Sequence, residues 1–287
     1  MDPDTTLFYA SLHKKGVTPE TVRLFRKIIK QHYRTSGRHN LPWRMTEDPY
    51  HILVSEIMLQ QTQVERVIDK YDQFLSVFPD FQALARSSPG PVITAWKGLG
   101  YNRRAIALHK IGKSVVSEFN GSLPASPDVL ASLPGIGRAT AASICAFAFN
   151  RPVVFIETNI RRVFIHFFFS DKNNVHDNEI LPLVEKTLVR SNPRGWYSAL
   201  MDFGAMMKKS GPNPNLKSVH YQKQPPFEGS RRQLRGRVLQ AVIESSGITR
   251  ARLVKTLGAD AGAVREVLHH LKKEGFLKQQ GRGFRFT

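Results

Sequence analysis

Apolar residues recur at intervals of three and four from about residue 19 to residue 203, a spacing that is typical of amphipathic helices. Pro and Gly interrupt this pattern at short intervals and separate one expected helix from the next. The expected helices lie at residues 22–33, 49–75, 103–119, 126–133, 137–149, 158–168 and 180–190. Strand-like alternation is scarce, apart from residues 151–157, which we interpret as an extended segment leading into the following helix. The pattern therefore predicts an all-α fold.

Two changes of pattern divide the rest of the chain. Residues 211–230 lose the periodicity and are rich in Pro, Gly and Asn, which predicts a linker. Helical periods then return in three segments, at residues 231–245, 249–257 and 260–275. The last residues, FLKQQGRGFRF, alternate around a Gly-Arg-Gly turn as a hairpin would. Three helices and a hairpin predict a winged helix-turn-helix module at residues 231–287.

Charge narrows the choice of partner. The 287 residues carry a formal net charge of +19 on an ordinary apolar fraction of 41%. Nucleic acid is a better partner for such a chain than an anionic membrane, because no stretch approaches transmembrane length. Residues 231–287 hold thirteen Lys or Arg and four Asp or Glu, a balance of +9. This favours DNA contact by the module over protein contact, although charge alone is also compatible with other basic proteins.

The chain has one cysteine, Cys145, which excludes an internal disulfide framework, a cysteine-rich zinc site and a four-cysteine iron–sulfur cluster. Cys145 lies in the apolar run SICAFAF, so we expect a buried thiol rather than a nucleophile. The first residues are mixed and polar, without a secretory signal. We expect an intracellular protein, cytoplasmic and associated with the nucleoid if its source is bacterial.

The segment LPGIGRATAASI contains a Gly-Ile-Gly turn between two expected helices. Gly135 and Gly137 allow the backbone to approach another surface closely, and amides at the start of the following helix suit a phosphate. This is the pattern of a helix-hairpin-helix, which grips one DNA backbone without reading its sequence. An ordinary helical hairpin with glycines in its turn is the alternative.

Glu56 lies on the apolar stripe of the segment LVSEIMLQQTQVERV and is followed closely by three glutamines and a threonine. Such a concentration of hydrogen-bonding groups is what a base-reading surface would need. Burial beside apolar groups would favour the protonated form of Glu56, as a general acid requires. Alternatively, Glu56 simply reaches sideways to water.

Several motifs occur in a fixed order: LPWR, the Glu56 segment, WKGLGYNRRAIALHKIG, LPGIGRATAASI, IETNIRRV and ALMDFGAMM. Together they resemble the adenine DNA glycosylase (MutY) branch of the helix-hairpin-helix (HhH-GPD) DNA glycosylase superfamily, over roughly residues 20–210. The resemblance implies a two-lobed helical glycosylase domain at residues 1–210, and the linker and the winged module predicted from the residue pattern follow it. It also implies an enzyme that flips a base out of double-stranded DNA containing a lesion or mismatch, and acts as a monomer.

The resemblance assigns roles by position. Glu56 matches the general acid that protonates the purine at N7, and Asn159 matches the asparagine that helps to hold the catalytic acids. The positions matching the base pocket or the wedge that enters the duplex are Trp43, Arg44, Gln60, Gln61, Tyr101, Asn102, Ala139 and Asp202. The positions matching the contact with the DNA backbone are Leu133, Gly135, Gly137, Arg138 and Thr140.

Glu157 stands where the superfamily has an aspartate that stabilises positive charge on the sugar. Base release needs such an anion beside a protonated acid, as in other glycoside hydrolyses. Glutamate keeps the charge but extends its reach by about 1.5 Å. The alternative for Glu157 is a salt bridge to Arg161, one helical turn later.

Four departures from the family change what the resemblance implies. Ala139 stands where bifunctional relatives carry a Schiff-base lysine, so we expect base removal without lysine-dependent strand cleavage. The four cluster-cysteine positions read Lys208, Asn215, Ser218 and Gln224, so we expect no cofactor, and a loop held by packing or mobile. Asn102 replaces a tyrosine that the family stacks beside 8-oxoguanine. The winged module also replaces the NUDIX-like domain.

The leading hypothesis is therefore a monofunctional glycosylase that removes adenine opposite guanine or 8-oxoguanine. A second hypothesis keeps the chemistry but changes the base to hypoxanthine, a damaged base, or thymine or uracil opposite guanine. A third is a catalytically inactive protein that binds lesions or mismatches. A transcription regulator is disfavoured, because it would leave the glutamate-bearing helix unexplained.

Overall fold

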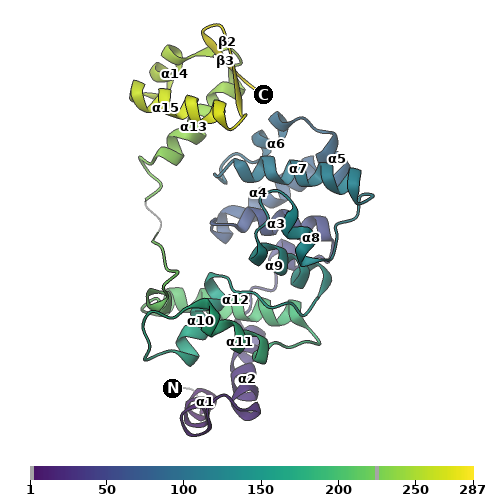
Figure 1. The fold of residues 1–287 in the computed structure, drawn as a ribbon, viewed down its shortest axis with the longest axis vertical. Helices are drawn as coiled ribbons and strands as arrows, with labels where there is room; N and C mark the ends of the chain where they lie inside the picture. Colours follow the sequence, from purple (N-terminus) through teal and green to yellow (C-terminus); the bar gives the residue numbers. More distant parts are fainter. Residues whose placement is uncertain (1–2, 224–225) are drawn as a thin grey trace. The chain divides into compact units, whose positions relative to one another are not determined.

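The computed structural model describes residues 3–223 and 226–287, and it is built mainly of helices, as the all-α prediction requires (Figure 1). The chain forms two compact units, each assembled from segments that are distant in sequence. The first unit contains the residues up to Leu53 together with Ala125–Ser132 and Ile136–Gln222. The second contains Val54–Pro124, Leu133–Gly135 and Lys223–Thr287.

The first unit is a helical bundle around an aromatic core. Its elements are α1 (Pro3–Lys15), α2 (Pro19–Ser36), η1 (Pro42–Arg44), α8 (Pro127–Ser132), α9 (Arg138–Phe149), α10 (Thr158–Phe168), α11 (Asp177–Thr187), α12 (Pro193–Ser210) and η2 (Pro214–Lys217). Helix α12 packs against both α2 and α10. Phe25 lies at their centre and makes edge-to-face contacts with Phe167 and Trp196, at centroid distances of 5.2 and 5.9 Å. Such pairs add to the hydrophobic stabilisation of a core, which here holds α10 and α12 together.

The second unit continues from α3 (Pro49–Leu59), whose first residues belong to the first unit. Its next helices are α4 (Val64–Val77), α5 (Phe81–Arg86), α6 (Pro89–Ala95) and α7 (Arg103–Glu118). The prediction of one helix over residues 49–75 is wrong, because a turn separates α3 from α4 and Gln61 there has a φ of +54°. Helix α6 was also not among the expected helices, since the Pro and Gly residues at 89–100 predict a break there. Pro89 begins α6 at a position where its missing N–H costs nothing.

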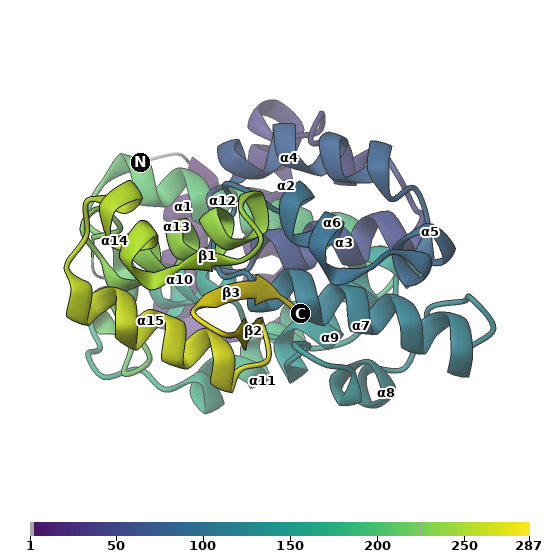
Figure 2. The ribbon, with the colours of Figure 1, turned by 90° about the horizontal axis from the view of Figure 1, so that it is seen from above.

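The C-terminal part of the second unit has the predicted three helices and hairpin (Figure 2). Its elements are α13 (Arg231–Glu244), β1 (Ile248–Thr249), α14 (Arg250–Leu257), α15 (Ala261–Lys273), β2 (Leu277–Gln280) and β3 (Gly283–Phe286). The short strand β1, which the pattern did not predict, pairs with the hairpin to give an antiparallel sheet of order β1-β3-β2. This order of helices and strands is that of a winged helix.

In residues 3–223 and 226–287, no helix combines the length and the hydropathy that crossing a membrane requires.

Candidate active site

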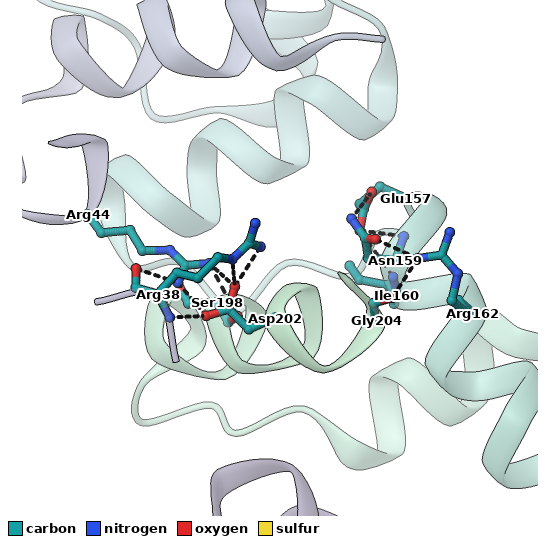
Figure 3. Close-up of polar contacts among 9 residues, drawn as sticks. All are labelled: Arg38, Arg44, Glu157, Asn159, Ile160, Arg162, Ser198, Asp202 and Gly204. Carbon is teal, nitrogen blue, oxygen red and sulfur yellow. Dashed lines mark hydrogen bonds and ion pairs between the residues drawn. The ribbon is translucent and has the colours of Figure 1, made fainter. Parts of the chain in front are cut away.

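Glu157 ends an extended apolar segment and is the N-cap of helix α10 (Figure 3). Its Oε1 accepts hydrogen bonds from the backbone N–H groups of Asn159 and Ile160, at 2.8 and 3.1 Å. These are two of the donors that a helix leaves without intrahelical partners at its start. The helix begins at Thr158, as predicted, and its backbone orients Oε1 of the carboxylate.

The alternative role for Glu157, a salt bridge to Arg161, is wrong. Both oxygens of Asp177 accept from Arg161, each at 2.7 Å. Asp177 lies sixteen residues further along the chain, in the first turn of α11. The pair therefore joins two helices and leaves the Glu157 carboxylate to the start of α10.

Asn159 links Glu157 to the neighbouring helix α12. Its Nδ2 donates to Glu157 Oε2 at 3.4 Å, and its Oδ1 accepts from Arg162 Nη1 at 2.8 Å. The same Arg162 nitrogen donates to the carbonyl oxygen of Gly204 on α12 at 2.6 Å (Figure 3). Arg162 is only 3% exposed. Asn159 is thus held from both sides, as a residue that positions a carboxylate must be.

Gly204 allows the close approach of α12 to this network. A Cβ atom at residue 204 would lie 2.4 Å from the carbonyl oxygen of Asn159 and 2.7 Å from its Cβ. Because neither backbone can give way easily in a packed bundle, only glycine fits here without displacing Asn159. A glycine inside a helix was the sequence signal that could have revealed this contact.

Burial raises the pKa of Glu157 above the ordinary glutamate value, although the N–H groups of Ile160 and Asn159 and the charge of Arg162 oppose the increase. Burial likewise lowers the pKa of the Arg162 guanidinium, and the nearby Glu157 opposes that decrease. The Glu157 anion is therefore poorly stabilised in the free protein. Such a carboxylate interacts strongly with positive charge that develops beside it, which is what an oxocarbenium-like transition state offers.

Asp202, on α12 as well, is the centre of a second buried network. It is 3% exposed, and its two oxygens accept from Arg44 Nη1 and Nη2 at 2.6 and 2.9 Å. Arg38 donates its backbone N–H and its Nε, at 2.8 and 2.7 Å (Figure 3). Burial alone would raise the pKa of Asp202, but hydrogen bonds and charge from Arg44 and Arg38 lower it below the ordinary value. Asp202 is thus an ionised anchor for the LPWR segment, in which Trp43 is half-buried.

Glu56 lies at intermediate exposure on α3, within the second unit. The end of its helix is held by Arg104 of α7, whose Nη1 donates to the carbonyl oxygens of Ile57 and Met58, both at 2.9 Å. The Nη1 of Arg104 also donates to Gln60, in the turn where the helix stops. Burial lowers the pKa of the Arg104 guanidinium to about 10, so it stays charged at neutral pH.

Arg104 also holds the loop that carries Tyr101 and Asn102. Its Nη2 donates to the carbonyl oxygens of Leu99 and Gly100 at 3.1 and 3.2 Å, and its guanidinium lies 5.3 Å from the centroid of the Tyr101 ring. Tyr101 is 41% exposed and has a φ of +47°. The two segments that resemble wedge and lesion-contact regions are therefore fixed to each other through one side chain, which the sequence analysis missed.

The Gly-Ile-Gly turn lies between α8 and α9, as the hairpin motif predicts. Gly135 has a φ of +78°, and a Cβ there would lie 2.7 Å from Ala107 Cβ, so this glycine is required by the fold. A Cβ at the exposed Gly137 would instead meet nothing within 4 Å. Gly137 is the N-cap of α9 and supplies no side-chain cap, so its helix presents amides to solvent, beside the exposed Arg138 and Ala139. Such amides suit a phosphate.

The loop after α12 is held without thiolates. Asn215 and Ser218, at two of the cluster-cysteine positions, are buried, and Asn215 donates to the carbonyl oxygen of Thr158 at 2.9 Å. Lys208 is exposed at the end of α12, whereas Gln224 lies outside the described residues. In the described chain no three His, Cys, Asp or Glu side chains gather as metal ligands would. Lys208, Asn215 and Ser218 carry no thiolate, so they do not fit an iron–sulfur cluster, and burial and a hydrogen bond hold the described part of the loop.

The predicted site residues fall into two groups. The first unit holds Trp43, Arg44, Gly137, Arg138, Ala139, Thr140, Glu157, Asn159 and Asp202, and the second holds Glu56, Gln60, Gln61, Tyr101, Asn102, Leu133 and Gly135. Within the first unit, hydrogen bonds join Glu157 to Asn159 and Arg44 to Asp202. Within the second, Arg104 joins the end of the Glu56 helix to the Tyr101 loop.

A helix-hairpin-helix turn together with a carboxylate that caps a helix is the arrangement expected of a helix-hairpin-helix DNA glycosylase. Comparison with known proteins identifies the family. Residues 54–186 match the family described as HhH-GPD superfamily base excision DNA repair protein. An adenine DNA glycosylase of Mycolicibacterium smegmatis is 31% identical over 268 residues, which cover 86% of this chain and 90% of that protein. The chain belongs to the HhH-GPD superfamily, as the motifs predicted.

Two further relatives show how far the similarity extends. An adenine DNA glycosylase of Buchnera aphidicola subsp. Baizongia pistaciae is 36% identical over 198 residues, which cover 68% of this chain and 56% of that protein. The chain thus spans little more than half the length of that relative. A solved thermostable thymine-DNA glycosylase is 27% identical, with a TM-score of 0.59 over 65% of this chain and 87% of that one.

Proposed function

We propose that this protein is a base-excision DNA glycosylase that flips a mispaired base out of duplex DNA and hydrolyses its N-glycosidic bond. The observation that carries the proposal is the Glu157 carboxylate, held at the start of α10 by two backbone N–H groups and raised in pKa by burial. An anion that is fixed in place and poorly stabilised suits a reaction in which positive charge develops on a sugar. The family membership supports the same reaction.

In the proposed reaction, Glu56 acts as the general acid that protonates the departing base. Glu157 stabilises the oxocarbenium-like sugar, and water is the final acceptor. Asn159 and Arg162 position Glu157, and Arg104 positions the helix of Glu56. The hairpin amides near Gly137 would bind a DNA phosphate, since they start a helix without a side-chain cap.

We also propose that the enzyme is monofunctional and needs no cofactor. Ala139 supplies no amine for a Schiff base, so strand cleavage through a lysine is not expected at this position. The only cysteine of the chain, Cys145, is buried, and its Sγ contacts the carbonyl oxygen of Ala125 at 3.4 Å. We propose catalysis by residues 1–210, a linker at 211–230, a DNA-contacting module at 231–287 and a monomeric enzyme.

Adenine opposite guanine or 8-oxoguanine is the proposed substrate, because two adenine DNA glycosylases are 31% and 36% identical to this chain. A second candidate is thymine or uracil opposite guanine. Asn102 replaces the tyrosine that the adenine-removing family stacks beside 8-oxoguanine, and Glu157 replaces the aspartate of the superfamily. The structurally similar protein is a thymine-DNA glycosylase. A protein that binds lesions without releasing a base is the remaining alternative.

The test is a panel of duplexes, each with one mispair or damaged base, incubated with the full chain in excess. Released bases are identified by mass spectrometry, and abasic sites are revealed as strand breaks after alkali treatment. We expect adenine release from duplexes with adenine opposite guanine or 8-oxoguanine, and strand breaks only after alkali. Glu56→Gln and Glu157→Gln should each bind the same duplexes without base release. Release of thymine or uracil alone would replace the adenine assignment, and binding without any release would overturn the enzymatic one.

A further inference from the structure

The winged module carries a concave basic surface that the proposed chemistry does not use. A cavity of about 590 Å³ opens between the start of α14, the length of α15 and the β2–β3 hairpin. Its lining residues are Thr249, Arg250, Ala251, Arg265, Leu268, His269, Lys272, Gln279, Arg282 and Phe284. Four of these side chains are Lys or Arg, and they come from three different elements. We call this surface the basic cavity.

The acids of the module are engaged elsewhere, so they do not neutralise the basic cavity. Glu244 pairs with Lys97, Glu266 with Arg231, and Glu274 with both Arg103 and Arg235. Asp260 caps α15 through the backbone N–H of Ala263, at 2.8 Å. None of the described residues that line the basic cavity carries a carboxylate. The four cations of the basic cavity therefore face no carboxylate of its lining.

Three of the four Lys or Arg residues are free of ion pairs within the described part of the chain. In the described ranges, Arg250, Arg265 and Arg282 are exposed and take part in no ion pair. Lys272 donates to Gln279 Oε1 at 2.9 Å, which joins α15 to the β2–β3 hairpin. Several unpaired cations arranged around a hollow attract a polyanion that can present several charges at once.

The start of α15 cannot read bases by the usual route. In a helix-turn-helix, the residues near the start of the second helix of the motif contact base edges in the major groove. Here the first turn is Ala261-Gly262-Ala263, which has no side chain long enough to reach and pair with a base edge. The long polar side chains begin only at Arg265. The helix start therefore offers no base-reading side chain, and the cations that follow it are of the kind that suits phosphates.

We propose that the basic cavity binds the phosphate backbone of duplex DNA without reading its sequence, as a second grip in addition to the one proposed for the Gly-Ile-Gly turn. This inference rests on the proposed function only in taking duplex DNA as the ligand. Such a grip would hold the enzyme on undamaged DNA during a search for mispairs, and its contribution would fall steeply with salt.

The test is fluorescence anisotropy of the full chain on duplexes that contain neither a mispair nor a lesion, one rich in A·T and one in G·C, over a salt series. The variant removes three charges of the basic cavity, Arg250→Gln, Arg265→Gln and Arg282→Gln together. A matched control removes three exposed charges elsewhere in the module, Arg252→Gln, Lys255→Gln and Lys273→Gln. Circular dichroism checks that both variants are folded.

Each lost phosphate contact reduces the magnitude of the slope of log binding constant against log salt concentration by about 0.9. The slope of the cavity variant, which lacks three cations, should thus be smaller than that of the wild type by about 2.7. Between 50 and 200 mM salt, the wild-type affinity should thus fall about 40-fold more than that of the variant. The change should be equal on both duplexes and absent from the control. An unchanged slope, an equal change in the control, or a change on one duplex only would overturn the proposal.

Base release is measured separately, in single turnover on the substrate found in the panel and at saturating enzyme. The cavity variant should keep the wild-type rate constant, because the chemistry lies elsewhere. If no duplex of the panel yields product, the proposed function is wrong, and the salt slope still tests DNA binding by the basic cavity. If base is released but the salt slope of the cavity variant equals that of the wild type, only DNA binding by the basic cavity is excluded.

Discussion

Gly204→Ala tests whether the contact between α10 and α12 positions the carboxylate of Glu157. The added Cβ would lie 2.4 Å from the Asn159 carbonyl oxygen, and ordinary contact begins near 3.4 Å, so the two must separate by about 1 Å. Asn159 bonds Glu157 through its backbone N–H and its Nδ2, and the displacement therefore reaches the carboxylate. A shift of this size in a reacting group costs roughly 100-fold in rate.

The stability of this variant should change much less than its activity. Overpacking costs about 1–3 kcal/mol. Replacing a glycine inside a helix by alanine returns roughly 0.5–1 kcal/mol. Gly236→Ala is the matched control, because residue 236 also lies inside a helix, α13, and a Cβ there would meet nothing within 4 Å. The control should be slightly stabilised and keep the wild-type activity.

The assay is single-turnover base release with enzyme in excess over a mispaired duplex, at a temperature where circular dichroism shows both variants folded. We expect the rate constant of Gly204→Ala to fall roughly 100-fold, and that of Gly236→Ala to stay unchanged. A folded Gly204→Ala protein that releases the base at the wild-type rate would refute the positioning of Glu157 through α12.

Three other substitutions follow from the buried networks. Glu157→Gln should raise the free energy of unfolding near neutral pH, because burial raises the pKa of Glu157 and the folded state therefore binds its proton more tightly. In the wild type, the stabilisation that comes from this bound proton is complete below the ordinary pKa of 4.5 and is lost as the pH rises through the folded pKa. The advantage of Glu157→Gln over the wild type should therefore vanish at low pH. Asp202→Asn should lower the free energy of unfolding by about 3–5 kcal/mol near neutral pH. The pKa of Asp202 is lowered in the fold, so the wild-type advantage should disappear as the pH falls below 3.8. Arg104→Lys should leave carbonyl groups at the end of α3 without hydrogen-bond partners. Each such group should lower the free energy of unfolding by about 1–3 kcal/mol, and amide hydrogen exchange at the end of α3 should become faster.

Denaturant unfolding at several pH values measures the first two substitutions, and hydrogen exchange measures the third. A stability gain for Glu157→Gln that persists unchanged below pH 4.5 would contradict the cause assigned to it. A neutral effect of Asp202→Asn would mean that the pairs with Arg38 and Arg44 add nothing net. Uniform exchange across α3 in Arg104→Lys would show that Arg104 does not hold the turn.

The local features of this fold follow from the sequence because their causes are local. The period of apolar residues predicts most helices, and a Gly-Ile-Gly turn predicts the hairpin. The start of α10 at Thr158 is predictable for the same reason, since Glu157 caps its own helix through residues two and three positions later. The sequence was thus sufficient to predict that the Glu157 carboxylate lies at the start of α10.

The features that the sequence did not reveal depend on residues far apart in the chain. The helix expected over residues 49–75 stops at Leu59, where Arg104 takes carbonyls that a continuous helix would have used internally. The two arginines that hold Asp202 lie 158 and 164 residues away from it. Gly204 is visible in the sequence as a glycine inside a helix, but its contact with Asn159 depends on the packing of α12 against α10. In each case the partner comes from tertiary packing, which periodicity does not describe.

The central claim is that Glu157 acts as the anion that stabilises the sugar while a base leaves. The most direct measurement is single-turnover release of adenine from a duplex with adenine opposite 8-oxoguanine or guanine, compared among the wild type, Glu157→Gln and Glu157→Asp. Glutamine keeps the size and removes the charge, whereas aspartate keeps the charge and shortens the reach by about 1.5 Å. We predict adenine release by the wild type, none by Glu157→Gln at unchanged DNA affinity, and a changed rate for Glu157→Asp. Wild-type release by Glu157→Gln would contradict the claim.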